Sequence, residues 1–383
     1  MYTATSGWMT QLYASISHLT LKDLFLPGAH DCGAFSGRQF SMINGFPIPE
    51  FVLKAIGCTQ DLDTVDQFFA GVRYFDCRIL CQAKPLFVHG PIKIDSSVFD
   101  FFRRLESAIC SPSFSQEIVI LKFSHMQFGN SRNKEQLYLK FQDEILRIFG
   151  KKLISKLSVP DLLTTTIGDL LTHGNIICIL PQYDEIKLHP PFYDFSNIDT
   201  GYYTYNDDCT LLYRPCRHDS SKRCTVGGSA FEAAEVMQYL DCREKDQRTV
   251  PLKITQAHLQ YDTANLLRML WCFMFTLKEH AQFHNINKRV CARLVDNPKE
   301  ASVVQFNFVT SDMAQIAFHI NASKVGVTTD MSPVQAFLGD CCRHSIFPYF
   351  LRSCVCCFIL LFVIMTALLP LQCVCLLIYM IWH

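Results

Sequence analysis

The sequence carries no excess of either charge, because 35 Lys and Arg residues balance 35 Asp and Glu residues in a chain of 383. With an isoelectric point of about 7.1, this balance argues against a nucleic-acid partner, which would need broad positive charge. The first 20 residues lack a basic start and an apolar segment of signal-peptide length. No internal repeat is visible, which argues against a repeat array. The length suits one large domain with an appendage.

Cysteine, by contrast, is abundant, and the 19 residues are scattered rather than arrayed. In a short secreted protein so many would predict disulfide bonds. Without a secretion signal we expect mostly reduced thiols in a cytosolic domain. Cys216, His218 and Cys224 offer only three of the four ligands of a structural zinc site. We therefore expect no metal ion and no other cofactor.

Apolar runs alternate with amphipathic segments, and this order predicts βα units with a parallel sheet. Strands are predicted over residues 24–27, 72–80, 87–89, 117–123, 174–181, 250–260 and 302–309. Helices are predicted over residues 59–70, 97–110, 131–150, 162–171 and 265–285. Thr59 is the expected N-cap of the first helix. The predicted fold class is α/β, a (β/α) barrel of the TIM type that is distorted or incomplete.

Two segments lie outside this pattern. Residues 34–58 form a predicted loop with four aromatic side chains, Phe35, Phe40, Phe46 and Phe51. These side chains either cover the core, which we favour, or form a rim that touches lipid. Residues 182–250 are predicted to be a long excursion with one helix near residues 231–240.

The end of the chain has a different character. Residues 354–382 contain no charged residue, and about 20 apolar residues suffice to cross a bilayer. Pro370 either kinks one tilted span, which we favour, or separates the halves of a re-entrant hairpin. Arg343 and Arg352 precede the stretch, as is typical of the cytoplasmic side. We expect a single-pass C-terminal transmembrane anchor, with the preceding domain facing the cytosol.

This assignment divides the chain into a barrel over residues 1–310, a linker over residues 311–346 and a membrane anchor over residues 347–383. Cysteines crowd the membrane boundary at Cys341, Cys342, Cys354, Cys356 and Cys357. Juxtamembrane cysteines are candidate S-acylation sites, here at Cys354, Cys356 and Cys357. Ordinary apolar packing is an equally good interpretation.

The chemistry-bearing residues cluster in three short segments of the first quarter of the chain. They are His30 and Asp31 in LPGAHDCG, Asp76 and Arg78 in GVRYFDCRI, and His89 in FVHGP. Each group sits where a predicted strand gives way to a turn, and barrel enzymes place their sites there. Two imidazoles and a guanidinium suit phosphoryl transfer, because one His can accept a proton, the other can donate one, and Arg can neutralise the phosphate.

These segments resemble a known family. Trp8-Met9, LPGAHDCGAF, Gln60, AGVRYFDCRIL, VHG and EIVILKFSHM follow one another over residues 8–126. This ordered set resembles the X domain of phosphatidylinositol-specific phospholipases C. The resemblance implies attack of the inositol 2-hydroxyl on the adjacent phosphate, which releases diacylglycerol and inositol 1,2-cyclic phosphate. It implies a membrane phosphoinositide lipid as the substrate.

The resemblance also implies roles. His30 falls on the general base and His89 on the general acid, while Asp31 and Asp76 would orient the imidazoles and Arg78. Arg78 replaces an acidic calcium ligand of the calcium-dependent members, and Lys122 stands where a further acidic ligand would be. Because cations there would repel Ca²⁺, the chain resembles the metal-independent branch.

Some positions depart from the family or stay open. Related small X-domain proteins usually carry Asp at the position of Lys122, so Lys122 either reaches substrate or marks weaker catalysis. Asn307 stands near an Asp that supports the base in bacterial members, and Asn cannot offset imidazolium charge. Lys253, Gln256, His258, Tyr183 and Tyr261 lie on or near late strands. Of all these we predict that Lys122, Lys253 and Tyr183 bind substrate.

Three hypotheses follow. The first is an active, calcium-independent, membrane-anchored phospholipase C that cleaves phosphatidylinositol or a glycosylated relative. The second is a non-catalytic X-domain protein that binds inositol lipids, which Lys122 and Asn307 motivate. The third is a metal-dependent phosphohydrolase with His30 and Asp31 as ligands, which Arg78 opposes by charge repulsion.

Overall fold

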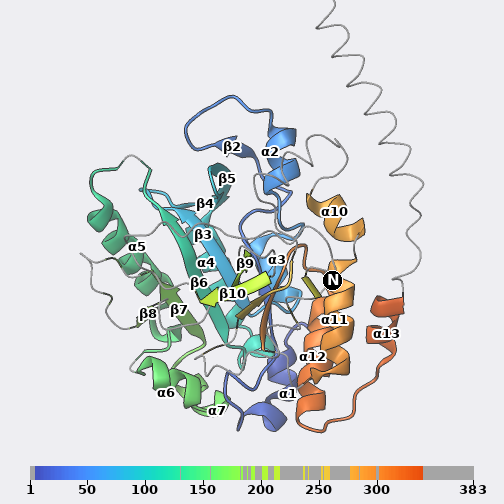
Figure 1. The fold of residues 1–383 in the computed structure, drawn as a ribbon. Helices are drawn as coiled ribbons and strands as arrows, with labels where there is room; N and C mark the ends of the chain where they lie inside the picture. The colour runs from blue at the N-terminus through green and yellow to red at the C-terminus, as the bar shows by residue number, and fades with distance from the viewer. Residues whose placement is uncertain are drawn as a thin grey trace, which may run out of the picture.

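A sheet of parallel strands forms the centre of the fold (Figure 1). The computed structural model describes residues 5–181 except 130 and 156, short pieces between residues 183 and 258, and residues 277–339 except 284 and 299–301. The parallel strands are β1 (Leu26–Ala29), β3 (Tyr74–Leu80), β6 (Val119–Gln127), β7 (Ile176–Leu180), β8 (Phe192–Asp194), β11 (Ile254–Gln256) and β12 (Val303–Phe306). Their order in the sheet is β11-β12-β1-β3-β6-β7-β8.

An antiparallel extension grows from the far half of β3. It consists of β4 (Leu86–His89), β5 (Ile92–Ser97) and β2 (Phe40–Met42), each paired antiparallel with its neighbour. β9 (Gly201–Tyr205) and β10 (Leu211–Pro215) make a separate two-stranded sheet. Leu86, the first residue of β4, pairs with Leu80 at the end of β3. β4 therefore runs back along β3 and brings its last residue, His89, toward the middle of that strand.

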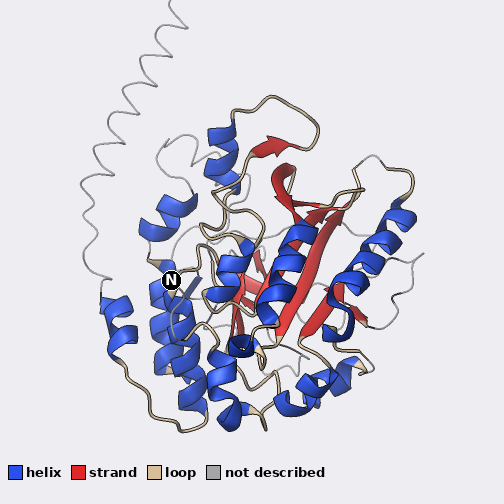
Figure 2. Cartoon of the chain, turned by 180° about the vertical axis from the view of Figure 1, so that it is seen from behind, coloured by secondary structure: helices blue, strands red, loops and turns tan. Residues whose placement is uncertain are grey.

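Helices lie around the outside of the parallel strands (Figures 1 and 2). They are α1 (Trp8–Ile16), α2 (Glu50–Gly57), α3 (Thr64–Phe69), α4 (Val98–Ile109), α5 (Lys134–Phe149), α6 (Val159–Thr164), α7 (Ile167–His173), α10 (Leu277–Phe283), α11 (Ile286–Asp296), α12 (Asp312–Lys324) and α13 (Ser332–Gly339). Short 3-10 turns follow α4 at Pro112–Phe114 and α5 at Gly150–Lys152.

The predicted barrel is confirmed in its coarser form, a mixed α/β fold with consecutive parallel strands side by side. Within the described residues the sheet is not closed, because β8 pairs only with β7 and β11 only with β12. Three of the parallel strands, β1, β7 and β12, are buried along their whole length. Burial on both faces explains their continuous apolar sequences.

Several local predictions need correction. The predicted helix at 59–70 begins only at Thr64, because Asp63 is its N-cap and accepts hydrogen bonds from the Val65 and Asp66 amides. Thr59 is instead buried, and its hydroxyl donates to the Asp31 carbonyl oxygen at 2.9 Å. The predicted helix at 162–171 is two helices, α6 and α7, since the Thr166 hydroxyl caps a new one.

The predicted loop at 34–58 also contains structure, namely β2 and α2. Phe35 and Phe40 are buried, whereas Phe46 and Phe51 are 62% and 75% exposed. Phe35 and Phe40 therefore cover the core as expected, whereas Phe46 and Phe51 are free to contact a partner. Most of the predicted excursion at 182–250, including most of its predicted helix, lies outside the described residues.

The predicted linker begins with an integral part of the fold. Within α12, apolar side chains on several sides, including Met313, Ile316 and Ile320, are buried. The Asn321 side chain holds the start of β1, because it accepts from the Phe25 amide at 2.8 Å and donates to the Phe25 carbonyl at 2.9 Å. The domain therefore extends past the boundary that we expected at residue 310.

Among the residues that the structure describes, no helix is long and apolar enough to cross a membrane. The segment predicted to do so, residues 354–382, lies outside the described residues together with Cys354, Cys356 and Cys357.

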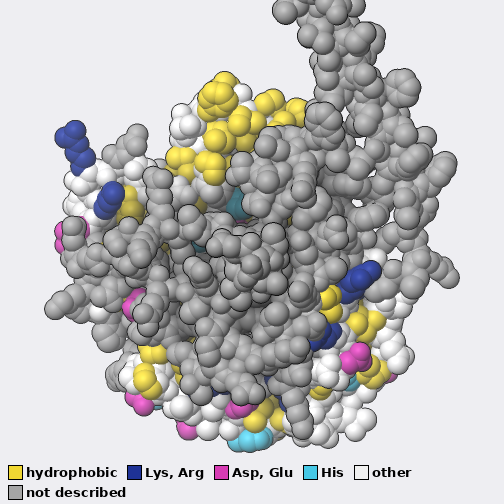
Figure 3. All heavy atoms as spheres, in the orientation of Figure 1, with side chains coloured by type: hydrophobic (Ala, Val, Ile, Leu, Met, Phe, Trp, Pro, Cys, Tyr) yellow, Lys and Arg dark blue, Asp and Glu magenta, His cyan; other side chains and the backbone are white. Residues whose placement is uncertain are grey.

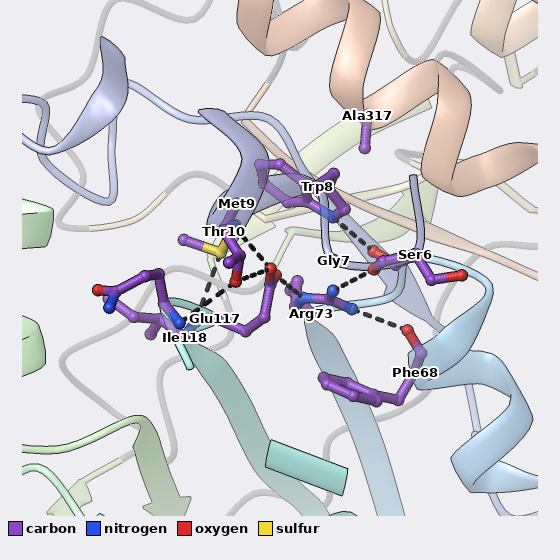
Figure 4. Close-up of polar contacts among 12 residues, drawn as sticks. Ser6, Gly7, Trp8, Met9, Thr10, Phe68, Arg73, Glu117, Ile118 and Ala317 are labelled. Carbon is purple, nitrogen blue, oxygen red and sulfur yellow. Dashed lines mark hydrogen bonds and ion pairs between the residues drawn. The ribbon is translucent and has the colours of Figure 1, made fainter. Parts of the chain in front are cut away.

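A buried ion pair fixes the amino-terminal ends of β3 and β6 (Figure 4). Arg73 Nε donates to Glu117 Oε2 at 2.6 Å, and neither side chain is exposed. The other guanidinium nitrogens donate to the Phe68, Val72 and Ser6 carbonyls at 2.7–2.8 Å. Glu117 Oε1 accepts from the Thr10 amide and hydroxyl, both at 2.8 Å. This network ties the segment before β3 to α1 and to the start of β6.

Candidate active site

The five residues predicted from the first quarter of the chain meet at the carboxyl ends of the strands. His30 directly follows β1, Asp31 comes next, and His89 is the last residue of β4. Asp76 and Arg78 lie on β3, where alternate side chains share a face. Parallel neighbours end at the same edge of a sheet. β3 continues past the end of β1, and the antiparallel strand β4 leads back to this edge at His89. This edge therefore carries the candidate site.

His30 is held on both ring nitrogens. Its Nδ1 lies 2.9 Å from Asn307 Oδ1, and its Nε2 lies 2.6 Å from Arg78 Nη2. A guanidinium can only donate, so Nε2 accepts and the ring proton sits on Nδ1, from which it is donated to Asn307. Burial and the nearby His258 and Arg78 hold the pKa of His30 well below its ordinary value. The ring is therefore neutral, with an unprotonated Nε2.

The His30 backbone is equally constrained. Its amide donates to the Phe306 carbonyl at 3.0 Å, and its carbonyl accepts from Gln60 Nε2 at 2.9 Å. Gln60 Nε2 also donates to Phe306 at 3.0 Å, and Gln60 Oε1 accepts from the Val309 amide. Gln60 thus links the ends of β1 and β12, and the resemblance had singled it out by sequence alone.

Arg78 joins the members of the site through its three nitrogens. Nε lies 3.2 Å from Asp76 Oδ2, Nη1 lies 3.5 Å from Asp31 Oδ2, and Nη2 contacts His30. Asp76 is nearly fully buried and also accepts from the Asp31 amide at 3.3 Å. The side chain of Arg78 is 15% exposed, so an anion can reach it from solvent.

Asp31 is the most strained member. Its φ is +46°, in the left-handed region that non-glycine residues rarely adopt. The side chain is fully buried, and neither carboxylate oxygen has a hydrogen-bond partner among the described residues. Burial raises the pKa of Asp31 to about 8, although Arg78 opposes this shift. Strain and an orphaned carboxylate of this kind are typical of functional sites.

His89 lies next to Asp31. Its Nε2 lies 3.6 Å from Asp31 Oδ2, and its side chain is 25% exposed. Burial and the charge of Arg78 lower the pKa of His89 to about 3. A Cβ added to Gly57 would lie 3.3 Å from His89 Nδ1, so the end of α2 packs against this ring.

The predicted substrate-binding residues are distributed differently. Lys122 lies opposite Asp76 in the β3–β6 register and is 1% exposed, inside the fold. Tyr183 packs edge-on against Phe128 and Tyr138, and its hydroxyl lies 3.5 Å from the Met126 carbonyl oxygen rather than at the histidine cluster. Lys253 lies outside the described residues.

His258, which sequence reasoning named without assigning it a role, belongs to the cluster. Its ring stacks on that of His30 with a centroid separation of 3.8 Å and an interplanar angle of 21°. The available signal was its position at the end of a predicted strand. The stacking itself joins β11 to β1, and no local pattern reveals such a contact.

Within the described residues, no group of three or more His, Cys, Asp and Glu side chains is arranged to hold a metal ion. The His30–Asp31 metal site of the third hypothesis also meets a direct obstacle. Arg78 contacts both proposed ligands, and a guanidinium in that place repels a divalent cation.

The fold is that of a known class of enzyme. Phosphatidylinositol-specific phospholipase C from Listeria monocytogenes matches with a TM-score of 0.52 over 83% of this chain and 99% of that one, at 14% identity. A variant of the Staphylococcus aureus enzyme matches with a TM-score of 0.51 over 82% and 96%, also at 14% identity. At such identity the likeness establishes a mixed α/β fold that resembles these enzymes.

Sequence relatives agree. The chain is 28% identical over 182 residues to PI-PLC X domain-containing protein 2 of Homo sapiens, covering 43% of this chain and 56% of that protein. It is 26% identical over 167 residues to PI-PLC X domain-containing protein 3 of Bos taurus, covering 39% and 49%. The chain thus spans about half the length of these relatives. No protein-family model matches the sequence. The resemblance to X-domain proteins that the sequence indicated is confirmed.

Proposed function

We propose that the chain is a phosphodiesterase of the lyase type that converts phosphatidylinositol, or its glycosylated form, to diacylglycerol and inositol 1,2-cyclic phosphate. One observation carries the proposal. A single guanidinium, Arg78, contacts the unprotonated nitrogen of a neutral imidazole, His30, on one side and the carboxyl–imidazole pair of Asp31 and His89 on the other. The proposed base, phosphate ligand and acid are thereby adjacent to one another.

His30 is the proposed base. Its Nε2 takes the proton of the inositol 2-hydroxyl while that oxygen attacks phosphorus. In the free site this nitrogen is covered by Arg78 at 2.6 Å. A bound phosphodiester attracts the guanidinium, and Arg78 can then turn from the imidazole to the phosphate oxygens, which bind it more strongly. Substrate binding would uncover the base and stabilise the developing charge in one movement.

The Asp31–His89 pair is the proposed acid. The pKa of Asp31 is raised to about 8 and that of His89 is lowered to about 3, so at neutral pH the pair holds one proton. The negative charge of a bound phosphodiester favours placing this proton on His89, the exposed partner. Transfer of the proton from His89 to the departing glycerol oxygen completes the reaction.

We further propose that no calcium ion is needed, because Arg78 supplies the positive charge at the phosphate. Asp76 holds Arg78 by its Nε. Lys122, which lies opposite Asp76 on β6, adds a second cation behind the site. Because it is buried, Lys122 would add positive charge near Asp76 and Arg78 without touching the substrate.

An apolar face beside the site supports a lipid substrate. Hydrophobic side chains gather over β2 and α2 (Figure 3), where Phe46 and Phe51 are exposed. The carboxyl end of α2 packs against His89, so this face is continuous with the acid. Substituting both residues, Phe46→Ser and Phe51→Ser, should weaken sedimentation with phosphatidylinositol vesicles, and unaltered sedimentation would remove this face from the proposal. Residues 354–382 remain our proposed membrane anchor, from sequence alone.

The test is release of inositol 1,2-cyclic phosphate from phosphatidylinositol vesicles by the full chain with excess chelator present. We expect release, and we expect His30→Ala and His89→Ala each to abolish it. His173→Ala is the matched control, because His173 is an exposed residue of α7.

Other outcomes separate the alternatives. Release only with added Ca²⁺ would contradict the role of Arg78 and leave the reaction standing. No release from phosphatidylinositol or from a glycosylated lipid, with vesicle binding retained, would favour the second candidate function, a non-catalytic inositol-lipid binder. Asn307 is the observation behind that candidate, since it gives His30 a hydrogen-bond acceptor without a charge.

A further inference from the structure

His258 contacts His30 through its ring face. The ring centroids are 3.8 Å apart and the planes differ by 21°, and both residues are buried. The strands on either side of β12 carry the two rings. The Ala257 amide, next to His258, donates to the Gln305 carbonyl at 2.9 Å, and the His30 amide donates to the Phe306 carbonyl at 3.0 Å. The stack is therefore set by the backbone of three adjacent strands.

Within the part of the chain that the structure describes, the His30 ring has no negatively charged partner at its edge to stabilise a bound proton. Asn307 accepts its Nδ1 proton but brings no negative charge. Arg78, at 2.6 Å from Nε2, opposes a positive charge on the ring. When His30 takes a proton in the reaction, the new imidazolium needs stabilisation from another direction.

The charged and titratable groups around the ring come from each neighbouring element. Asp31, on the segment after β1, and Asp76, on β3, both face Arg78, and His89, on β4, faces Asp31. Among the residues described, His258 is the only titratable side chain that β11 and the residues after it place against the His30 ring. An aromatic face attracts a cation, and the attraction grows when both groups are buried.

We propose that His258 is a positioning residue for His30: its ring fixes the plane of the base and stabilises the imidazolium through its π face, in place of the carboxylate that Asn307 does not supply. The inference rests on the proposed function, in which His30 is the base. Burial and the charge of Arg78 lower the pKa of His258 to about 3. The repulsion by which His258 lowers the pKa of His30 requires a protonated His258. At neutral pH His258 is neutral, so it presents only its π face to the His30 ring.

The test compares two substitutions of similar bulk in the full chain. His258→Phe keeps a π face, and His258→Leu does not. We expect the Leu variant to lose about tenfold in kcat, with KM changed less than about twofold, and the Phe variant to stay within about threefold of the parent. If the Leu variant does not fold by circular dichroism, His258→Met supplies an unbranched apolar side chain. Equal kcat in the Phe and Leu variants would overturn the proposal.

A second arm asks whether the ring replaces a carboxylate. Asn307→Asp restores a charge at Nδ1 and should recover most of the kcat that His258→Leu loses, while adding much less to the parent. A merely structural role for His258 predicts no such rescue. Absence of recovery in a folded double variant would therefore count against the proposal.

A third arm needs no turnover, so it separates this inference from the proposed function. It uses the Asn307→Asp background, where a carboxylate raises the pKa of His30. Nuclear magnetic resonance titration should give a higher His30 pKa when His258 is kept or changed by His258→Phe than when it is changed by His258→Leu. The same order without any cyclic phosphate release would reject the proposed function and keep the stacking. An identical pKa in the two substitutions would reject the stacking role.

Discussion

Two clusters of buried charge lie along β3, and they are built in opposite ways. At its amino end, Arg73 and Glu117 are fully buried and pair directly at 2.6 Å. At its carboxyl end, Arg78 is held by Asp76 at 3.2 Å and by Asp31 at 3.5 Å, and it stays partly exposed. In barrel enzymes the amino end serves stability and the carboxyl end serves function.

The difference lies in how completely each cluster is satisfied. Both carboxylate oxygens of Glu117 accept hydrogen bonds, from Arg73 and from Thr10. Neither carboxylate oxygen of Asp31 does so among the described residues. A buried carboxyl group without hydrogen bonds is costly, and such a group is typical of a functional site. The Asp31 carboxyl group without hydrogen bonds and the partly exposed Arg78 guanidinium are the features behind our proposal that the carboxyl end of the strand reacts.

The largest effect that we expect is at the satisfied end. Arg73→Met leaves Glu117 buried without its cation and removes donors from three carbonyls. Breaking such a pair costs about 3–5 kcal/mol of unfolding free energy, which chemical denaturation will measure. The matched control is Arg104→Met, because Arg104 pairs with Asp63 on the surface, where a pair contributes less than about 1 kcal/mol. If both variants lost the same free energy of unfolding, the buried Arg73–Glu117 pair would contribute no more stability than a surface pair.

The next effect concerns activity. Arg78→Met removes the phosphate ligand, and loss of one such group costs about 10²–10³ in kcat/KM. The free energy of unfolding should fall less than for Arg73→Met, because a carboxyl group left near a like charge can take up a proton. Cyclic phosphate release and denaturation on the same preparation check both parts. A variant as unstable as Arg73→Met would mean that both clusters are structural.

The sequence brought five residues of the first quarter of the chain together as one candidate site, and the structure places them side by side. Their roles stay predictions. The sequence did not predict how Arg78 covers His30 or how His258 stacks on it, since these contacts join strands far apart in the chain. It also placed α12 in a linker. The buried residues of α12 lie on several sides of the helix, so no amphipathic period marks it as part of the fold.

A smaller effect depends on pH. The pKa of folded Asp31 is raised to about 8 from 3.8, so the folded state holds this proton more tightly than the unfolded state. The associated stability is fully present at low pH and is lost as pH rises from about 4 to about 8. Asp31→Asn removes this dependence and should be more stable than the parent at pH 8 by about 1–3 kcal/mol, with the gap closing toward pH 4. A constant gap across this range would show that Asp31 is not protonated in the fold.

The smallest expected effect comes from removing one hydroxyl group at each end of β3, and it tests the difference between the two clusters directly. The Thr10 hydroxyl donates to Glu117 and the Thr59 hydroxyl to the Asp31 carbonyl. Thr10→Val and Thr59→Val should each lower the free energy of unfolding by about 1 kcal/mol. Only Thr59→Val should also lower kcat, by a few fold, because that hydroxyl holds Asp31 at its positive φ.

Thermal unfolding and cyclic phosphate release decide between these expectations for the two valine variants. If Thr10→Val lowered kcat as much as Thr59→Val, activity would follow global stability rather than the local geometry of Asp31. If neither changed kcat while both lost stability, the strained backbone of Asp31 would be held by its other contacts, the Ala34 amide and the Asp76–Cys32 bond. Only a loss of kcat confined to Thr59→Val would show that the strained backbone of Asp31 contributes to activity.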